Sequence, residues 1–410
     1  MVIVGAGIGG SALAYVLAQA DLSVVLLEKT RVHKDVVRGE WLAPWGVQQA
    51  QALGLLDVYM EHGAHRPKKH LNYSDLSPPE QAEQASLVFT DMGVPEPLCL
   101  GHPATCNLLN TMAQDAGAEL VRGIRALRVV PGLKPHISFV QDGRFVELSP
   151  RWVVGADGRN GVVASQIGAN LLHDEEHHLF SGMLVEGADD WPEDVQVIAT
   201  EGDVNVLAFP QGGGKVRVYL GWPKEDRARL VGPSGPQRFL QAWQLDSVPY
   251  AHAIAQAKPI SPCIAYPNFD AWADRQVVPG VVLIGDAAGR NDPIIGQGLS
   301  ITHADVRQVA DAFLGNSQWD TDIFQPYVEE RAERMRRLRI VARLTSLKES
   351  AFGDDGFKLR HDIHTKLDQQ PELGASLAAG FVGPMALPDE VFGEAFSSAL
   401  VGQPIWNQLP

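Results

Sequence analysis

Residues 2–10 read Val-Ile-Val-Gly-Ala-Gly-Ile-Gly-Gly, a short apolar run that leads straight into a glycine-rich turn. A segment with helical character follows over residues 11–20, and a second apolar run over residues 23–27 ends at Glu28. Strand, glycine turn, helix, strand and acid form the order that a dinucleotide-binding βαβ unit needs. This stretch therefore predicts a Rossmann-like domain with a dinucleotide ligand.

The glycines and the acid of this stretch have separate predicted tasks. Gly5 allows the tight turn after the strand, Gly7 lets a pyrophosphate approach the backbone, and Gly10 lets the helix pack close to the strands. Glu28 lies about 20 residues after the turn, where a carboxylate accepts a hydrogen bond from a ribose hydroxyl. A glycine-rich turn in some other βαβ unit is the alternative interpretation, and it leaves Glu28 without a role.

The composition is that of an ordinary globular protein. The chain has 410 residues, 45% of them hydrophobic and 20% charged, and this length suits two or three packed units. A net charge of −15 argues against nucleic acid or an anionic membrane as the main partner. Cys99, Cys106 and Cys263 are too scattered for a disulfide framework or a metal site. We therefore expect a reducing cytoplasm, no bound metal, and neither a membrane span nor a secretory leader.

A different pattern begins near residue 179 and predicts a second domain. Short apolar runs alternate with turns, and three glycines at 212–214 read as a hairpin loop. The expected strands cover residues 183–186, 195–200, 204–209 and 216–222. Residues 236–257 are expected to be helical, and the apolar run 281–284 returns the chain to the first domain. We interpret this region as an antiparallel sheet that carries the substrate site.

The last third of the chain is predicted to be mainly helical. Long helices are expected over residues 298–314 and 324–350, and the second contains a run of arginines that we interpret as a solvated helix face. The predicted fold class is α/β: a Rossmann-like domain, an antiparallel substrate domain and a helical C-terminal region. The expected boundaries assign 1–70, 101–178 and 276–345 to the first domain, 71–100 and 179–275 to the substrate domain, and 346–410 to the C-terminal region.

Three separate stretches carry a family resemblance. They are the glycine turn at 5–10, Gly-Ala-Asp-Gly at 155–158, and Gly-Asp-Ala-Ala at 285–288 followed by Pro293 and Gly-Gln-Gly at 296–298. In this order they resemble the FAD-dependent aromatic hydroxylases, the single-component flavoprotein monooxygenases typified by p-hydroxybenzoate hydroxylase. The likeness covers roughly residues 1–345. Residues 38–40, Arg-Gly-Glu, with Pro44 are similar to the branch that holds flavin halogenases and geranylgeranyl-type reductases.

The resemblance implies a role for each matching residue. Gly5, Gly7 and Gly10 would lie on the FAD pyrophosphate and Glu28 on the adenosine ribose. The remaining cofactor-binding residues that it implies are Arg38 near the pyrophosphate, His102, Asp157, Asp286 on the ribityl side, and Gly298. Pro293 and Gly296 would form the environment of the flavin ring, and no acid or base is assigned. For Asp157, the residues alone favour a turn cap in an Asp-Gly loop.

The chain departs from the family pattern at several positions. Gly161 and Ala164 stand where the family often has serine and arginine, and His102 stands where an arginine usually touches the cofactor. A neutral imidazole donates one hydrogen bond and no bidentate pair. FAD binding should survive these changes. There is no second glycine fingerprint for a nicotinamide domain, which agrees with transient NAD(P)H binding in the family and leaves a separate reductase open.

The resemblance implies that reduced flavin reacts with O2 to a C4a-hydroperoxide, which transfers one oxygen atom to an aromatic or polyketide-like small molecule. The protein must hold the ring, exclude water and aim the substrate. The residues expected to line the substrate pocket are Met183, Phe209, Tyr219 and Trp222. Tyr219 and Trp222 should face opposite sides of one strand, so we expect one of the two in the pocket. His177 and His178 read as part of a polar surface loop.

Two other functions remain open at this stage. An FAD-dependent reductase of isoprenoid double bonds is favoured by the Gly39-Glu40 pair. A flavin-binding protein without turnover is favoured by the departures at Gly161 and Ala164. A halogenase is disfavoured because the chain contains no Trp-x-Trp-x-Ile-Pro stretch.

Overall fold

The predicted βαβ unit is present, since β1 (Val2–Val4), α1 (Ile8–Gln19) and β2 (Val25–Glu28) follow one another. The computed structural model describes residues 1–35, 37 and 39–406 of the chain. The unit belongs to a sheet with the strand order β20-β21-β11-β1-β2-β7, which is parallel except for the β20–β21 pair. Its other strands are β7 (Glu119–Arg122), β11 (Val153–Gly155), β20 (Val277–Val278) and β21 (Val281–Leu283).

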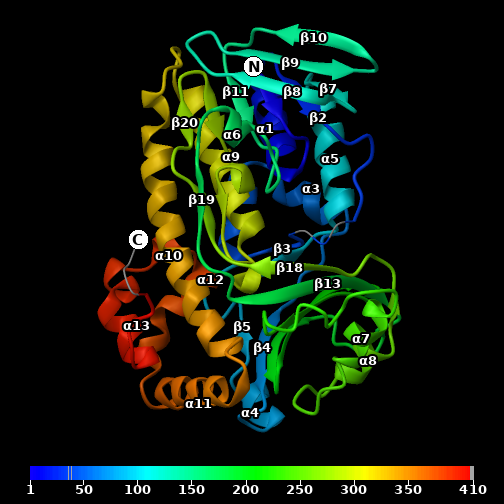
Figure 1. Cartoon of the computed structure of the whole chain (residues 1–410), viewed down its shortest axis with the longest axis vertical. Helices are drawn as coiled ribbons and strands as arrows, with labels where there is room; N and C mark the ends of the chain where they lie inside the picture. The colour runs from blue at the N-terminus through cyan, green and yellow to red at the C-terminus, as the bar shows by residue number, and fades with distance from the viewer. Residues whose placement is uncertain (36, 38, 407–410) are drawn as a thin grey trace.

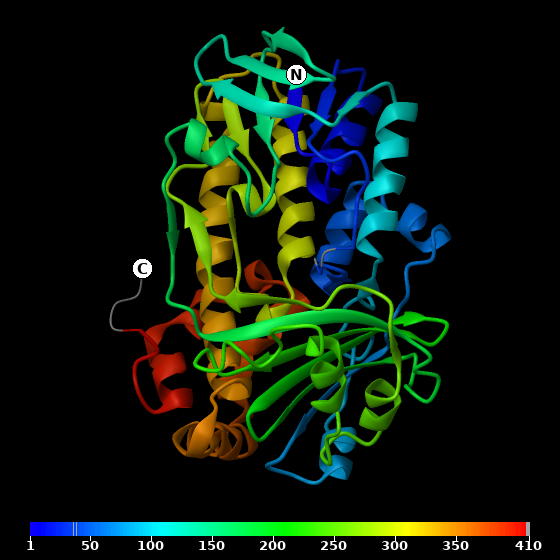
Figure 2. The ribbon, with the colours of Figure 1, turned by 45° about the vertical axis from the view of Figure 1, so that its right-hand side comes forward.

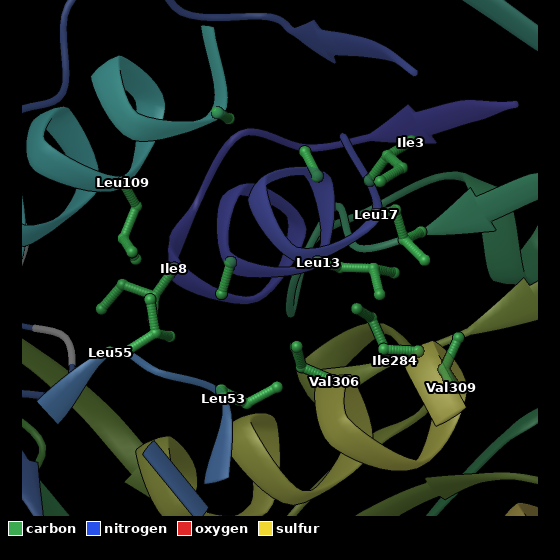
Figure 3. Packing of buried hydrophobic residues seen from close by; sticks show 14 of the residues in the cluster. Ile3, Ile8, Leu13, Leu17, Leu53, Leu55, Leu109, Ile284, Val306 and Val309 are labelled. Atoms are coloured by element: carbon green, nitrogen blue, oxygen red, sulfur yellow. The ribbon is translucent and has the colours of Figure 1, made fainter. Parts of the chain in front are cut away.

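Helices cover one face of this sheet and a small antiparallel sheet covers the other. Figure 3 shows α1 between α5 (His102–Asp115) and α9 (Gly298–Gly315), with Leu109 on one side and Val306 on the other. These side chains belong to one buried apolar cluster. Burying a side chain of this size stabilises the fold by about 1.5–3 kcal/mol. The opposite face packs on β8 (Arg125–Val130), β9 (His136–Gln141) and β10 (Arg144–Leu148).

The second sheet lies below the first domain in the view of Figure 1. Its order is β17-β13-β16-β15-β14-β4-β5, with β18 also paired to β13. Its neighbours are antiparallel except β4 and β14, which run parallel. The strands are β4 (Lys69–Ser74), β5 (Leu87–Val88), β13 (His178–Glu186), β14 (Val195–Glu201), β15 (Val204–Gly212), β16 (Lys215–Trp222), β17 (Lys258–Pro259) and β18 (Ile264–Asn268).

Two short helices cover the outer face of the second sheet. They are α7 (Gly235–Gln241) and α8 (Ala251–Ala255), and they replace the continuous helix expected over residues 236–257. Pro249 lies between them and cannot donate a helical hydrogen bond, so one uninterrupted helix is disfavoured there. The other face of the sheet is turned toward the first domain (Figures 1 and 2).

The remaining short elements lie within the two domains or between them. They are β3 (Trp41–Leu42), α2 (Pro44–Ala52), α3 (Leu56–Glu61), α4 (Pro79–Gln84), β6 (Leu98–Cys99), α6 (Val163–Gln166), β12 (Leu171–His173), β19 (Ala271–Ala273), β22 (Gly289–Arg290) and the 3₁₀ turns η1 (Gly285–Ala287) and η2 (Pro293–Ile295). The pair β3–β6 and the three strands β12-β19-β22 form two small separate sheets.

The C-terminal region is helical, as predicted. Helix α10 (Gln325–Glu349) runs beside both halves of the molecule in both views (Figures 1 and 2). It is followed by α11 (Gly353–Gln369), α12 (Ala379–Val382) and α13 (Glu394–Val401). Within the described ranges, no helix is both long enough and apolar enough to cross a membrane. The predicted fold class is confirmed.

Candidate functional site

A cavity of about 470 Å³ lies between the Rossmann-like domain and the second sheet. One side consists of the glycine turn after β1 and of residues between β21 and α9, and the other consists of aromatic and apolar side chains of the second sheet. The predicted site residues that line this cavity are Gly7, His102, Phe209, Tyr219, Asp286, Pro293, Gly296 and Gly298. Segments far apart in the sequence are thus brought together.

The glycine turn has the geometry that its sequence predicts. Gly5 has φ +103°, and a Cβ there would overlap the carbonyl oxygen of Ala156. A Cβ on Gly10 would overlap the carbonyl oxygen of Gly5, so α1 can approach the turn only without a side chain. Apart from its own neighbours along the chain, no heavy atom of the described residues lies within 4 Å of a Cβ built on Gly7. The backbone at Gly7 is therefore open to a ligand.

The carboxylate of Glu28 lies beside this turn. Its Oε2 accepts a hydrogen bond from the N–H of Ala6 at 2.8 Å. Its Oε1 accepts from the N–H and the hydroxyl of Thr30, at 2.8 and 2.7 Å. Glu28 is 7% exposed. The acid is thus fixed at the end of β2, next to the backbone that would hold a pyrophosphate.

The segment between β21 and α9 carries the other predicted ligands. Asp286 lies in η1 and lines the cavity. Gly296 has φ +66°, and a Cβ there would lie 2.9 Å from the ring of Trp41. Gly298 begins α9, and no heavy atom of the described residues lies within 4 Å of a Cβ built on it. A side chain added at Gly298 would therefore enter free space, whereas one at Gly296 would collide with Trp41.

His102 begins α5 and lines the cavity where the resemblance implies an arginine. Its backbone N–H is hydrogen-bonded to the carboxylate of Glu40, and its ring Nε2 lies 3.8 Å from the Sγ of Cys106. Arg38, predicted to lie near the pyrophosphate, is outside the described residues.

Asp157 has a local structural role and is absent from the residues that line the cavity. Its Oδ2 accepts hydrogen bonds from the N–H groups of Val162 and Val163, at 2.6 and 3.0 Å, at the start of α6. A Cβ on Gly161 would overlap this carboxylate, which explains why a larger residue is missing there. Asp157 therefore caps the loop through Oδ2, as the residues alone favour, and its predicted cofactor role stays a prediction.

The second sheet divides the predicted substrate residues between its two faces. Phe209 and Tyr219 line the cavity, as predicted from alternation for one residue of the Tyr219–Trp222 pair. Met183 and Trp222 lie in the core against α7 and α8, on the opposite face. Their assignment to the substrate pocket is wrong. Trp222 lies three positions after Tyr219 on β16, and Met183 pairs with Val218, so both side chains point to the face opposite Tyr219.

A buried ion pair joins the two domains beside the cavity, and the sequence analysis missed it. The side chain of Arg217 in β16 is fully buried and donates through Nη2 to Glu40 and to Asp35, at 2.8 Å each. Glu40 lines the cavity, and burial raises its pKa to about 7 although Arg217 opposes the shift. The signal available in the sequence was a charged residue two positions before Tyr219, on the inward face of an otherwise apolar strand.

Of the two histidines read as a surface loop, His178 is buried and His177 is half-buried. His178 begins β13 and is 1% exposed, and burial lowers its pKa to about 4. The Nδ1 of His177 lies 3.0 Å from the Oδ2 of Asp292, whose Oδ1 accepts from the N–H of Ile294. His177 therefore connects the start of the second sheet to the turn that carries Pro293.

The arginine run of α10 is also buried in part, which corrects the prediction of a solvated face. Arg331 and Arg334 are 2% and 1% exposed and both contact Asp305 of α9. Arg337 donates to the carbonyls of Pro384 and Leu387. A charge run gives no information on burial by itself, because Asp305, which neutralises Arg331 and Arg334 in the interior, belongs to another helix.

Two further cations line the cavity. The guanidinium of Arg159 lies 5.5 Å from the ring centre of Tyr266, and that of Arg290 lies 4.5 Å from the ring centre of Phe269. Among the described residues, no carboxylate oxygen lies within 4 Å of either guanidinium. Burial and the charge of Arg159 lower the pKa of Arg290. These two side chains place positive charge at the cavity, and the carboxylates of Asp286 and Asp270 oppose the lowering of the pKa of Arg290.

Comparisons with known proteins agree with this architecture. Residues 1–340 match the model of a family described as FAD binding domain. The chain is 25% identical over 387 residues to the flavin-dependent oxygenase ucdD of Aspergillus ustus, covering 82% of this chain but 58% of that protein. It is 28% identical to a digeranylgeranylglycerophospholipid reductase of Methanothrix thermoacetophila, covering 89% and 91% of the two chains.

A solved structure shows the same fold. The p-nitrophenol 4-monooxygenase PnpA of Pseudomonas putida superposes with a TM-score of 0.76 at 16% identity, covering 93% of this chain and 97% of that one. At this identity the likeness concerns the fold alone. The predicted family is confirmed by the match over residues 1–340, which includes the glycine turn, the Gly155–Gly158 stretch and the Asp286 segment. The chain belongs to the FAD binding domain family.

Proposed function

We propose that this protein is an FAD-dependent monooxygenase that inserts one oxygen atom of O2 into an aromatic or polyketide-like small molecule. The observation that carries the proposal is the cavity itself. A segment with glycines at 296 and 298 and the aromatic side chains of Phe209 and Tyr219 line the same cavity. Such a space can hold a flat ring between a cofactor and an apolar wall.

The residues present fit FAD. The backbone at Gly7 is open, Gly5 and Gly10 permit the close turn, and Glu28 lies beside it as a partner for a ribose hydroxyl. Asp286 lines the cavity, and its carboxylate would accept hydrogen bonds from hydroxyls on the flavin side of the cofactor. We propose that binding is non-covalent. FAD, when bound, would supply the electron transfer that activates O2.

The chain's own residues would exclude water and orient the substrate. Phe180, Leu207 and Phe209 give the second sheet an apolar surface at the cavity. Burial raises the pKa of Tyr219 well above its usual value, so its phenol stays protonated at neutral pH and can donate one hydrogen bond. A protonated donor next to an apolar wall would select a substrate with an oxygen acceptor on an aromatic frame.

We propose NAD(P)H as the reductant. Arg159 and Arg290 support this proposal, because their positive charges at the cavity suit the phosphates of a dinucleotide. A separate reductase remains the second route. Steady-state oxidation of NADH and NADPH by the purified flavoprotein, with and without substrate, distinguishes the two routes. A cytoplasmic location is part of the proposal and rests on the dispersed cysteines.

A reductase of isoprenoid double bonds is the second candidate. It is favoured by the Gly39-Glu40 pair at the cavity and by the digeranylgeranylglycerophospholipid reductase among the relatives. A flavin-binding protein without turnover is the third candidate, and the geometry at Gly161 weakens it, because that departure serves the fold of the Asp157 loop.

Labelled dioxygen separates these candidates. The holoprotein is supplied with ¹⁸O2, reductant and a panel of phenols, polycyclic aromatics and isoprenoid alkenes, and products are weighed by mass spectrometry. One labelled oxygen atom in a product supports the monooxygenase. A product two hydrogen atoms heavier, formed equally well without O2, supports the reductase. Neither product, with FAD bound and reductant consumed at the rate of the blank, supports the protein without turnover.

A further inference from the structure

The backbone turn that carries Asp286 is held from behind by one buried guanidinium. Arg331 of α10 donates to the carbonyl oxygens of Gly285, Ala288 and Gly289, at 3.3, 3.2 and 3.0 Å. Arg331 is 2% exposed. A single side chain thus donates hydrogen bonds to carbonyl oxygens at both ends of a five-residue turn.

Asp305 of α9 binds both the turn and the guanidinium of Arg331, and it is fully buried. Its Oδ2 accepts from the N–H of Gly285 at 2.8 Å and from the Nε of Arg331 at 3.0 Å. Its Oδ1 accepts from Arg334 at 2.8 Å. The carboxylate therefore fixes the first residue of the turn and the orientation of the guanidinium together.

The backbone of the turn can follow its path only with glycine at both ends. Gly285 has φ +58° and Gly289 has φ +129°, and β21 ends at Leu283, three residues before Asp286. Asp286 lies between these two glycines and lines the cavity, whereas Arg331 and Asp305 are absent from the residues that line it. Arg331 and Asp305 would therefore affect a ligand in the cavity only indirectly, through the position of the turn.

We propose that Arg331 and Asp305 are positioning residues for the cofactor: they hold the turn 285–289 so that the carboxylate of Asp286 faces the FAD. The inference rests on the proposed role of Asp286 in binding FAD. It predicts that the loss of Arg331 weakens FAD binding through Asp286, in addition to any effect on the stability of the chain.

Arg334 provides a matched control for a structural role. It lies one turn further along α10, is 1% exposed, and pairs with the same Asp305. It also pairs with Glu330 and donates to the carbonyl of Ile301 at 3.4 Å, and it contacts no carbonyl of the turn 285–289. Removing Arg334 disturbs the same buried charge cluster without releasing the turn directly.

The experiment is a double-mutant cycle on FAD affinity. Arg331→Lys, Asp286→Ala, the double variant and Arg334→Gln are purified, stripped of flavin and titrated with FAD by fluorescence quenching. Near-ultraviolet circular dichroism and thermal melts verify that each apoprotein is folded. We expect Arg331→Lys to raise the Kd for FAD at least tenfold in the wild-type background and less than threefold in the Asp286→Ala background. Arg334→Gln should change the Kd less than threefold.

Several results would overturn the proposal. Independent effects of Arg331→Lys and Asp286→Ala would show that Arg331 does not act through Asp286, and so would equal losses in Arg331→Lys and Arg334→Gln. If Arg331→Lys fails to fold, Asp305→Asn takes its place, since asparagine keeps an acceptor for the N–H of Gly285 and removes the charge that orients Arg331. If wild type binds no FAD, the proposed function fails first. If Asp286→Ala alone keeps full affinity while Arg331→Lys loses it, FAD binding stands and this inference falls.

Discussion

Arg217 and Glu40 meet in the interior of the molecule, one from the second sheet and one from the segment after β2, with an Nη2–Oε1 distance of 2.8 Å. Their side chains are 0% and 3% exposed. A buried ion pair adds little net stability, but removing one partner leaves an uncompensated charge. The pair therefore acts as a specific, buried connection between the two domains.

This relationship gives the first prediction. Arg217→Met should lower the free energy of unfolding by about 3–5 kcal/mol, because Glu40 loses the guanidinium that neutralises it. The double variant Arg217→Met with Glu40→Gln should recover part of this loss. Urea denaturation of the three proteins measures both effects. Equal stability of the single and double variants would show that the two residues are not energetically coupled.

Asp286 gives the second prediction. Asp286→Ala should leave the chain folded and raise the Kd for FAD by roughly 10- to 150-fold, the equivalent of about 1.5–3 kcal/mol for a charge-assisted hydrogen bond. Fluorescence titration of the apoprotein measures the change. Asp311→Ala, at an exposed position of α9, is the control and should bind FAD as wild type does. Unchanged affinity in Asp286→Ala would contradict the cofactor assignment.

The glycines of the segment 296–298 give the third prediction. Gly298→Val places a side chain in free space, so product formation should fall by at least tenfold while the fold is kept. Gly296→Val should lose stability and bound flavin together, because valine is strained at φ +66° and meets Trp41. Thermal melts, flavin content and turnover of each variant separate the two effects. Full activity of Gly298→Val would show that the reaction occurs elsewhere in the cavity.

The two faces of the second sheet give the fourth prediction. Phe209→Ala removes part of the apolar wall and should lower kcat/KM roughly 10- to 200-fold, the equivalent of about 1–3 kcal/mol in transition-state binding. Met183→Leu, a change of similar volume on the opposite face, should leave kcat/KM unchanged. Both are measured with a substrate identified in the labelled-dioxygen experiment. If both variants keep the kinetics of wild type, the substrate does not contact this sheet.

His303 gives a pH-dependent prediction. Burial lowers its pKa to about 4, and its ring lies 2.9 Å from the hydroxyl of Tyr59 and 2.8 Å from the carbonyl of Leu299. The folded state holds the neutral ring, whereas the unfolded chain takes up a proton at a pKa of about 6.5. The free energy of unfolding is therefore highest above pH 6.5 and decreases as the pH falls toward 4. Wild type should lose about 3 kcal/mol more than His303→Gln over this range. Denaturant titrations at several pH values test it, and parallel curves would exclude the assignment.

The sequence was sufficient where neighbours along the chain determine the structure. The turn at Gly5–Gly10 and the position of Glu28 at the end of its strand depend on local geometry, and both are found as predicted. Alternation placed Tyr219 and Trp222 on opposite faces but could not say which face meets the cofactor domain. That choice depends on α7 and α8, which cover the Trp222 face.

The buried charges could not be predicted from the sequence because their partners are distant. Arg217 meets Glu40 across 177 residues, and Arg331 meets Asp305 across 26. When the partner is not known, a run of arginines on a helix is interpreted as a face exposed to solvent. The same holds for His177, whose contact with Asp292 spans 115 residues.

Helix α10 is anchored at both ends, and this limits how the cavity can open. Near its start Arg331 binds the cofactor turn, while at its end the Oε1 of Glu349 accepts from Asn72 of β4 at 2.6 Å and its carbonyl accepts from Thr200 of β14 at 2.7 Å. The helix thus connects the turn 285–289 to the second sheet and holds the two at a fixed distance. Any swing of the sheet away from that turn must break the buried bonds at one end or bend the helix, so ligands are expected to enter through side-chain and loop motions on the side away from α10.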